Sequence, residues 1–216
     1  MVIIVGTDDA GRGPCIGPMV IAGVSVDEKE LNKLSDLGVK DSKLLTPKQR
    51  EFLYDKIIEV VKNYKAIVVP ASEVDNAVES ETTNLNWLES EKFAMVINYL
   101  KPDRAIVDCP SPNIPAYTEH LRTFLKVKTH LQCSHKADLK FVVVGAASII
   151  AKVTRDREVA KLREKYGDFG SGYPSDPKTK EYLAKNWKKH PEIFRKSWSC
   201  YKKYSGEKKQ SSLADF

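Results

Sequence analysis

Short apolar runs alternate along this chain with segments of helical periodicity, and this alternation constrains the fold more than any other feature. The runs are rich in Val and Ile, have the length of strands, and most of them end at or just before Asp or Pro. The predicted strands are residues 2–7, 19–26, 64–70, 103–109 and 127–133. The predicted helices are residues 47–63, 84–100, 114–125 and 141–167, then two short basic helices over 179–190 and 191–204. Strands interleaved with helices, and then helices alone, predict an α/β sheet with a helical C-terminal layer.

Charge is distributed unevenly along the chain. The net charge is +6, but residues 151–216 hold 17 Lys and Arg against nine Asp and Glu. A near-neutral N-terminal part followed by a basic C-terminal third is typical of a protein that binds a polyanion, although a solvated helical surface has the same composition. No apolar run approaches the ~20 residues that a membrane-spanning helix needs.

The remaining bulk features predict a cytoplasmic protein, which we expect to be a monomer. The chain opens directly on a strand-like run, MVIIVG, without a basic leader, so we expect no secretory signal. Its four cysteines are scattered without a CxxC pair, which disfavours a zinc site and predicts free, mostly buried thiols, although a hyperthermophile could pair some of them. They are Cys15, Cys109, Cys133 and Cys200.

Carboxylates stand where predicted strands end. Asp8 and Asp9 close the first strand, and Asp108 closes the fourth. Asp138 lies between the fifth strand and the long helix, where a simple helix cap explains it equally well. Ligands bind at strand carboxyl ends in α/β sheets, and carboxylates that meet there repel one another unless a hard cation such as Mg²⁺ joins them. Two such ions about 3.5–4 Å apart can clamp the reacting oxygens of a phosphodiester.

A glycine-rich turn with an arginine follows the first acidic pair, at Gly11, Arg12 and Gly13. Glycines let backbone N–H groups approach a ligand, and Arg pairs with phosphate or with a carboxylate. Alone, such a pattern is more often a tight turn. Directly after a metal-type acidic pair, it favours a phosphate-binding loop.

Six motifs together give the chain a family resemblance. In order they are GTDDAGRGPCIGPMVIAG, VKDSKLLT, IVDC, SHKAD, GAASIIAKVTRDR and GSGYPSDP. Over about residues 3–204 the chain resembles the type 2 ribonucleases H (RNase HII), and its tail resembles archaeal members. The resemblance implies an RNase H fold, which is a five-stranded mixed sheet with helices on both faces and a C-terminal helical extension. Because the chain starts at the first motif, we expect no N-terminal domain of the RNase HIII type.

The resemblance also implies an activity. The family cleaves the RNA strand of RNA/DNA hybrids, and cleaves DNA 5′ to embedded ribonucleotides, as in ribonucleotide excision repair. It uses Mg²⁺ or Mn²⁺ and leaves 3′-hydroxyl and 5′-phosphate ends. Its four catalytic, metal-ligating acids fall on Asp8, Asp9, Asp108 and Asp138. One ion, held mainly by Asp8 and Asp138, is expected to activate water, and the other, held mainly by the remaining acids and Asp8, to stabilise the leaving oxygen.

The family's substrate contacts fall on further positions of this sequence. Gly11, Arg12 and Gly13 correspond to the motif that senses the ribose 2′-hydroxyl. Tyr173 corresponds to the tyrosine that packs on the neighbouring sugar. Lys40 and Lys43 resemble phosphate contacts. The resemblance divides the chain into a catalytic domain (1–165), a helical substrate-binding region (166–204) and a flexible tail (205–216).

One position departs from the family pattern, because Asp9 stands where the family has glutamate. Consecutive strand residues point to opposite faces, and a glutamate is long enough to curl back toward its neighbour's metal. The shorter aspartate predicts weaker binding of one ion or a shifted preference toward Mn²⁺, unless the backbone compensates.

Several other residues have two readings. Lys136 either tunes the metal site or solvates a loop, and His135 is either a proton shuttle or structural. Ser148 either faces the active site or packs closely. The C-terminal basic helices are expected to grip the DNA strand, with Trp187 and Trp198 in their core.

The last residues, QSSLADF, resemble a peptide that binds the sliding clamp PCNA, with its anchors at Gln210, Leu213 and Phe216. Apolar residues on an otherwise polar tail fit a segment that folds into a partner's groove. The second aromatic residue of such peptides is missing, because the sequence ends.

Two other functions fit the same residues. A junction resolvase of the RNase H fold has similar acids but cuts DNA that lacks ribose. A hybrid-binding protein without catalysis keeps the basic region and needs no metal.

Overall fold

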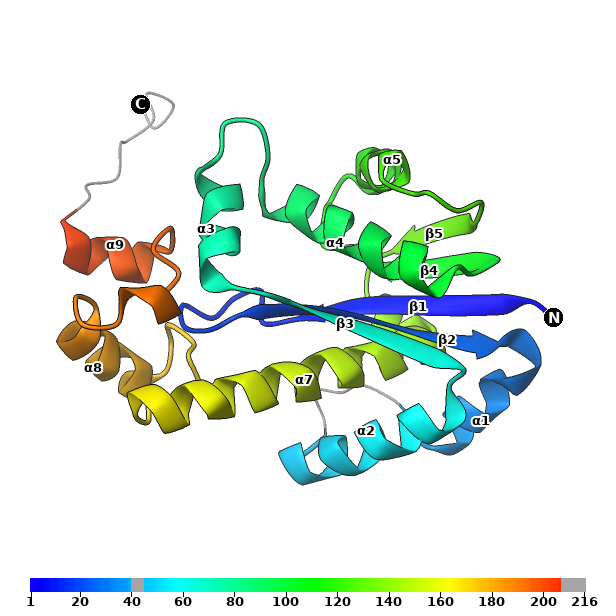
Figure 1. Ribbon diagram of the computed structural model, residues 1–216, viewed down its shortest axis with the longest axis horizontal. Coiled ribbons are helices and arrows are strands. Elements are labelled where there is room, and N and C mark those ends of the chain that lie inside the picture. The colour runs from blue at the N-terminus through cyan, green and yellow to red at the C-terminus, as the bar shows by residue number, and fades with distance from the viewer. Residues whose placement is uncertain (40–44, 207–216) are drawn as a thin grey trace.

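Five strands form one mixed sheet in the computed structural model, which describes residues 1–39 and 45–206 (Figure 1). The strands are β1 (Ile3–Ala10), β2 (Met19–Asp27), β3 (Asn63–Val69), β4 (Arg104–Asp108) and β5 (His130–Ser134). Their order across the sheet is β3-β2-β1-β4-β5. β2 runs antiparallel to β1 and β3, whereas β1, β4 and β5 run parallel. The predicted five-stranded mixed sheet is therefore confirmed.

Helices cover both faces of the sheet (Figure 1). On the lower face in this view lie α1 (Leu31–Asp36), α2 (Pro47–Val60) and α7 (Val142–Tyr166). On the upper face lie α3 (Ala71–Glu79), α4 (Leu85–Leu100) and α5 (Ile114–Thr123). Each face has its own apolar core, as expected for a sheet sandwiched between two helical layers.

The central strands supply both cores by simple alternation. In β2, Val20 and Ala22 belong to the core beneath the sheet, whereas Met19 and Ile21 belong to the core above it. A strand that is buried on both faces must be apolar throughout, which is why these strands read as continuous apolar runs rather than as alternating ones.

The long helix α7 crosses beneath the centre of the sheet. It forms one uninterrupted helix of 25 residues, as its length predicts despite its many β-branched residues, and it ends at Gly167 with φ 87°. Its start lies so close to β1 that a Cβ on Gly6 would collide with the backbone of Val143 and Val144. This close approach brings the first turns of α7 against the strand that carries the acidic pair.

A third layer packs on the far end of α7, at the left of Figure 1. It consists of α8 (Pro177–Asn186), the 3₁₀ turn η3 (Pro191–Ile193) and α9 (Ser199–Ser205). Its apolar cluster joins Phe169, Phe194 and Tyr201 to Cys15 and Ile16, which precede β2. The C-terminal region is therefore built onto the loop between β1 and β2.

The prediction of one helix over 191–204 is wrong. Phe194 is extended, with ψ 147°, and forms an isolated β-bridge with Ile16. The backbone N–H of Arg195 donates to the carbonyl of Cys15 at 2.9 Å. These long-range backbone bonds compete with helix formation, so helical structure is confined to the two ends of the segment.

Further helical elements were not predicted, namely α1, α3, the 3₁₀ turn η1 (Glu28–Glu30) and the short α6 (Ala137–Lys140). Lys40 and Lys43, and the tail residues Gln210, Leu213 and Phe216, lie outside the described residues. The division at 165/166 stays a prediction. Within residues 1–39 and 45–206, none of the helices combines the length and apolar character needed to cross a bilayer.

Candidate active site

A pocket of about 310 Å³ opens where β1 and β4 end. It is lined by Asp8, Asp9, Ala10, Gly11, Arg12, Gly13, Asp108, Asp138, Ser148, Lys152 and Tyr173. Every residue that the family resemblance assigns to catalysis or to the substrate, and that the structure describes, is in this set. The motifs that carry these residues are far apart in the sequence, so the fold brings them together.

Asp8 and Asp9 leave β1 on opposite faces of the sheet. Asp8 faces α7, where its carboxylate is hydrogen-bonded to Ser148. Asp9 faces α4, where its charge acts on the buried Glu89. The backbone N–H of Asp9 donates to Oδ1 of Asp8 at 2.8 Å. The predicted alternation therefore holds, and the two carboxylates reach the pocket from different sides.

Asp108 and Asp138 reach the pocket from neighbouring elements. Asp108 is the last residue of β4, which runs parallel to β1. The backbone N–H of Ala137 donates to Oδ1 of Asp108 at 2.6 Å, at the start of α6. Asp138 lies in the first turn of that helix. This hydrogen bond joins the end of β4 to the start of α6. It orients the carboxylate of Asp108 and brings Asp138 to the same pocket.

The electrostatics of the pocket favour a cation. Burial, and then the charges of Asp9 and Asp108, raise the pKa of Asp8 well above its ordinary value. Within residues 1–39 and 45–206, no three His, Cys, Asp or Glu side chains are gathered tightly enough to form a ready-made metal centre. The carboxylates of the pocket repel one another, so they are expected not to gather more tightly than this. The donor set, which is four carboxylates on one pocket, is nevertheless the oxygen-only chemistry that Mg²⁺ and Mn²⁺ prefer.

The loop of Gly11, Arg12 and Gly13 is fixed through its carbonyl groups. The buried guanidinium of Arg195 donates to the carbonyls of Gly11 at 2.6 Å and of Arg12 at 2.8 Å. The indole N–H of Trp198 donates to the carbonyl of Gly13 at 3.2 Å. With its carbonyls bound on the protein side, the loop can turn its N–H groups toward a ligand.

Gly11 itself cannot be another residue without strain. Its φ is 88°, in the left-handed region, and a Cβ there would collide with the side chain of Arg155. Glycine is therefore required here by a protein side chain, and the close approach of this backbone to a ligand stays a prediction.

The side chain of Arg12 lies at the pocket rim and pairs with a carboxylate outside the four predicted acids. It forms an ion pair with Glu89, which is fully buried on α4. Its Nη2 also donates to Oδ1 of Asn86 at 2.7 Å. Burial, followed by the charge of Asp9, raises the pKa of Glu89 to about 8, and Arg12 opposes this shift.

Tyr173 faces the glycine-rich loop from the turn that precedes α8. A Cβ on Gly13 would lie 3.5 Å from Cε1 of its ring, and the guanidinium of Arg155 lies 5.8 Å from the ring centroid. The adjacent Gly172 accepts a backbone hydrogen bond from Cys15 at 2.8 Å. Tyr173 is 39% exposed, so its side chain remains accessible to a ligand.

Three residues of the site were missed at the sequence level. Lys152 lines the pocket one helical turn after Ser148 and is paired with Asp156. The spacing of Ser148 and Lys152 on one helix face could have indicated this. Glu89 and Arg195 carry no such signal, because their positions depend on how distant elements pack.

His135 and Lys136 are near the site but do not line the pocket. Nδ1 of His135 lies 2.9 Å from the carbonyl oxygen of Cys109, and the side chain is exposed. Lys136 adopts φ 52° immediately before α6. Both residues therefore shape the turn that leads to Asp138, which favours a structural role for His135 and a loop role for Lys136.

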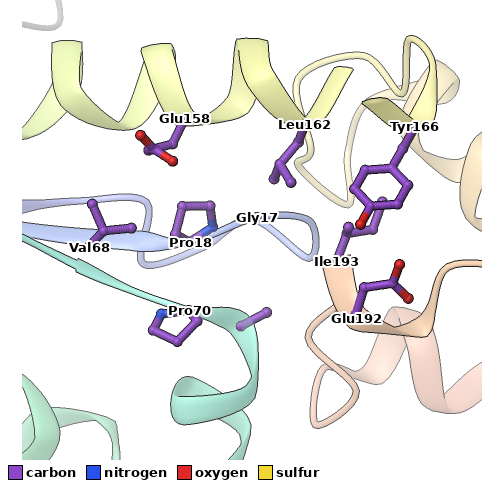
Figure 2. Close-up of a pocket in the computed structure, with 10 residues that line it drawn as sticks. Gly17, Pro18, Val68, Pro70, Glu158, Leu162, Tyr166, Glu192 and Ile193 are labelled. Carbon is purple, nitrogen blue, oxygen red and sulfur yellow. The ribbon is translucent and has the colours of Figure 1, made fainter. Parts of the chain in front are cut away.

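A second cavity, of about 230 Å³, lies on another part of the molecule (Figure 2). Leu162 and Tyr166 of α7 point into it, opposite Pro18, Pro70 and Ile193. The carboxylates of Glu158 and Glu192 lie along its walls. None of the predicted site residues lines this cavity, so the acidic pocket remains the candidate active site.

Comparisons with known proteins show which family the chain resembles over nearly its whole length. Residues 5–201 match the family model described as Ribonuclease HII. The chain is 44% identical over 215 residues to Ribonuclease HII of Pyrococcus horikoshii, covering 97% of this chain and 96% of that one. A crystal structure of the ribonuclease H2 from the same organism superposes with a TM-score of 0.87, covering 94% and 97% of the two chains.

A chain from the solved structure of an archaeal complex is also similar to this protein. The structure of the PCNA:RNase HII complex from Archaeoglobus fulgidus contains a chain that is 37% identical, with a TM-score of 0.82 and full coverage of both chains.

Proposed function

Because the chain belongs to the ribonuclease HII family, it is a metal-dependent ribonuclease that acts on RNA/DNA hybrids, and we propose that it also cuts DNA 5′ to embedded ribonucleotides. Cleavage uses two divalent ions and leaves 3′-hydroxyl and 5′-phosphate ends. The observation that carries the proposal is the single pocket in which four carboxylates adjoin a glycine-rich loop and a tyrosine. The enzyme works in the cytoplasm.

The four aspartates would hold the metal ions. Mg²⁺ or Mn²⁺ bound there would supply positive charge for activating water and for stabilising the leaving 3′-oxygen. The chain's own contribution is to orient the carboxylates. Ser148 fixes Asp8 from α7, and the N–H of Ala137 fixes Asp108 from α6. The carboxylates of Asp8 and Asp108 are thus oriented before the substrate arrives, which lowers the reorganisation needed during the reaction.

Recognition of ribose comes from the loop of Gly11, Arg12 and Gly13. A site built to hydrogen-bond a hydroxyl rejects the substrate that lacks it, because its polar groups are then left unpaired. Tyr173, whose ring faces Gly13, packs on the neighbouring sugar. The C-terminal region contributes by holding the loop through Arg195 and Trp198, and its lysines contact the nucleic acid backbone without sequence preference.

One assay tests this function and separates it from its rivals. The substrates are a duplex with one ribonucleotide, the matching all-DNA duplex and an RNA/DNA hybrid, each with Mg²⁺, Mn²⁺ or chelator. We expect metal-dependent cleavage of the first and third substrates only. Cleavage of the all-DNA duplex would favour a resolvase, and binding without cleavage in any metal would favour a hybrid-binding protein.

The tail is proposed to bind a sliding clamp. The sequence QSSLADF has clamp-peptide spacing at Gln210, Leu213 and Phe216, and the similar archaeal RNase HII has been solved in complex with PCNA. Surface plasmon resonance with an archaeal PCNA tests this, using Phe216→Ala and Leu213→Ala. We expect both changes to abolish binding while leaving cleavage without the clamp unaltered. Equal binding by wild type and both variants would refute the motif.

A further inference from the structure

The contact between Arg12 and α4 has no part in the mechanism above. Glu89 lies on α4, whose other buried side chains are Ser90 and six apolar residues. Its Oε2 accepts a hydrogen bond from Nη1 of Arg12. Its Oε1 is buried and has no hydrogen-bond partner among residues 1–39 and 45–206. An ionisable group with one unsatisfied oxygen is therefore built into the helix–sheet interface beside the pocket.

Stability alone does not account for this pair. Glu89 loses its hydration on burial, whereas the Arg12 side chain keeps part of its own, and replacing buried charged groups by apolar residues is often neutral or stabilising. The unsatisfied Oε1 adds to that cost. A residue that lowers stability in this way is often kept because a functional site requires its side chain at that position.

A second hydrogen-bond acceptor on the same face of α4 also binds the guanidinium of Arg12. Asn86 precedes Glu89 by three residues, so both side chains project from one face of α4. Oδ1 of Asn86 accepts from Nη2 of Arg12 at 2.7 Å, while Glu89 accepts from Nη1. A planar guanidinium bound at both Nη atoms has a fixed orientation. These two bonds occupy two of its five N–H donors, and the side chain remains 36% exposed.

The backbone of Arg12 is held from a different direction. Its carbonyl accepts from Nη1 of Arg195 at 2.8 Å, in the C-terminal layer. The loop path is therefore set by the C-terminal layer, whereas the direction of the Arg12 side chain is set by α4. A change in Glu89 or Asn86 can release the side chain without releasing the loop.

We propose that Glu89 and Asn86 are positioning residues that hold the Arg12 guanidinium for a backbone phosphate of the bound nucleic-acid strand. Arginine is suited to this because its fork of N–H donors matches phosphate oxygens. Substrate affinity then depends on residues of α4, which lie outside the four predicted acids. The proposal rests on the proposed function and adds the residues that orient its arginine.

Electrostatics alone predicts no loss of binding, which makes the proposal testable. Because burial raises the pKa of Glu89 to about 8, Glu89→Gln removes little negative charge at neutral pH, so on Coulombic grounds binding should tighten slightly or stay unchanged. If Glu89 acts by placing Arg12, the same substitution weakens binding. The effect must also vanish when Arg12 is absent, because Glu89 then has nothing to place.

The experiment is a double-mutant cycle measured by fluorescence anisotropy. The probe is a labelled duplex with one ribonucleotide, in chelator so that nothing is cleaved, and the proteins are wild type, Glu89→Gln, Arg12→Ala and the double variant. We expect Glu89→Gln and Arg12→Ala each to raise Kd about tenfold, and the double variant to bind no more weakly than Arg12→Ala. Arg12→Ala should also lower the salt dependence of log Kd by about one unit.

Asn86→Ala provides a milder variant should Glu89→Gln unfold, with an expected rise in Kd of about threefold that is also lost in the Arg12→Ala background. The matched control is Glu73→Gln, which removes another carboxylate paired to α4, through Lys92, away from the pocket. It should leave Kd unchanged.

Tighter or unchanged binding by Glu89→Gln, additive effects in the double variant, or an equal loss in Glu73→Gln would overturn the proposal. Cleavage by the wild type with Mg²⁺ is measured in parallel. Absence of that cleavage would refute the proposed function, whereas a failed cycle with active wild type would refute only the role of Glu89 and Asn86.

Discussion

The guanidinium of Arg195 donates a hydrogen bond of 2.6 Å to the carbonyl of Gly11, although the two residues are 184 positions apart in the chain. Arg195 is fully buried, and burial followed by the charge of Arg155 lowers its pKa to about 10, so it stays charged at neutral pH. The segment around it is anchored in turn by Asp75, which accepts from the backbone N–H groups of Lys196 and Ser197. The loop beside the acids therefore depends on the last elements of the fold.

Arg195→Met tests this dependence. Two buried carbonyls, those of Gly11 and Gly17, and the part-buried carbonyl of Arg12 lose a donor, and each unsatisfied buried group costs about 1–3 kcal/mol. We expect the free energy of unfolding in urea to fall by at least about 3 kcal/mol, and the KM for a single-ribonucleotide duplex to rise. Lys196→Met, at an exposed neighbour, should change neither quantity. Similar stability of the two variants would show that the carbonyl bonds contribute little.

Asp9→Glu tests the departure from the family pattern. The extra methylene lets the carboxylate curl back toward Asp8, so we expect half-maximal cleavage at a Mg²⁺ concentration about tenfold lower. Asp55→Glu makes the same chemical change at an exposed position on α2 and should have no effect. An Asp9→Glu enzyme with unaltered rate and Mg²⁺ dependence would mean that the backbone already compensates for the shorter side chain.

Asp8→Asn should separate stability from activity. Because the folded-state pKa of Asp8 is raised, its ionised form destabilises the metal-free protein, and this penalty appears as pH rises above about 4, the pKa in the unfolded chain. In chelator, Asp8→Asn should therefore be more stable than wild type at neutral pH, with the difference shrinking as pH falls. Urea denaturation across pH measures this. A variant less stable than wild type at neutral pH would contradict it.

Metal should reverse that order. Mg²⁺ binds the folded wild type and stabilises it by mass action, whereas Asp8→Asn should gain little. Cleavage by Asp8→Asn should fall at least about a hundredfold, since the ligand is lost. Asp55→Asn serves as the control in both measurements.

Thiol reactivity should differ sharply among the cysteines. A hydrogen bond from the Cys15 thiol lowers the pKa of Cys200 to about 7, whereas burial raises that of Cys133 to about 11. Iodoacetamide at pH 7 should therefore label Cys200 first, with a rate that rises through pH 7 as the thiolate forms. Mass spectrometry identifies the labelled residue.

The control for this prediction is Cys15→Ala, which removes the donor. The labelling rate of Cys200 at pH 7 should then drop about fivefold, because less thiolate is present, although each thiolate is more nucleophilic. An unchanged rate would show that another neighbour sets its reactivity.

Much of the fold could be predicted from the sequence because it rests on local signals. The apolar runs of β1, β2 and β4 are dictated by burial on both faces, and the length of α7 separates it from a strand. The segment 191–204 was mispredicted for the converse reason. Its backbone pairs with Cys15 and Ile16, which no local pattern reveals.

The sequence by itself determined which carboxylates to consider, since Asp8, Asp9 and Asp108 stand where apolar strands end and Asp138 stands at a helix start. Only the tertiary structure decided that they share one pocket, that Glu89 rather than one of them takes the Arg12 side chain, and that Arg195 fixes the loop. The physical reason is the separation along the chain over which each kind of interaction acts. Periodicity and turn chemistry act over a few residues, whereas a buried ion pair forms only where packing brings two distant segments together and removes water from between them.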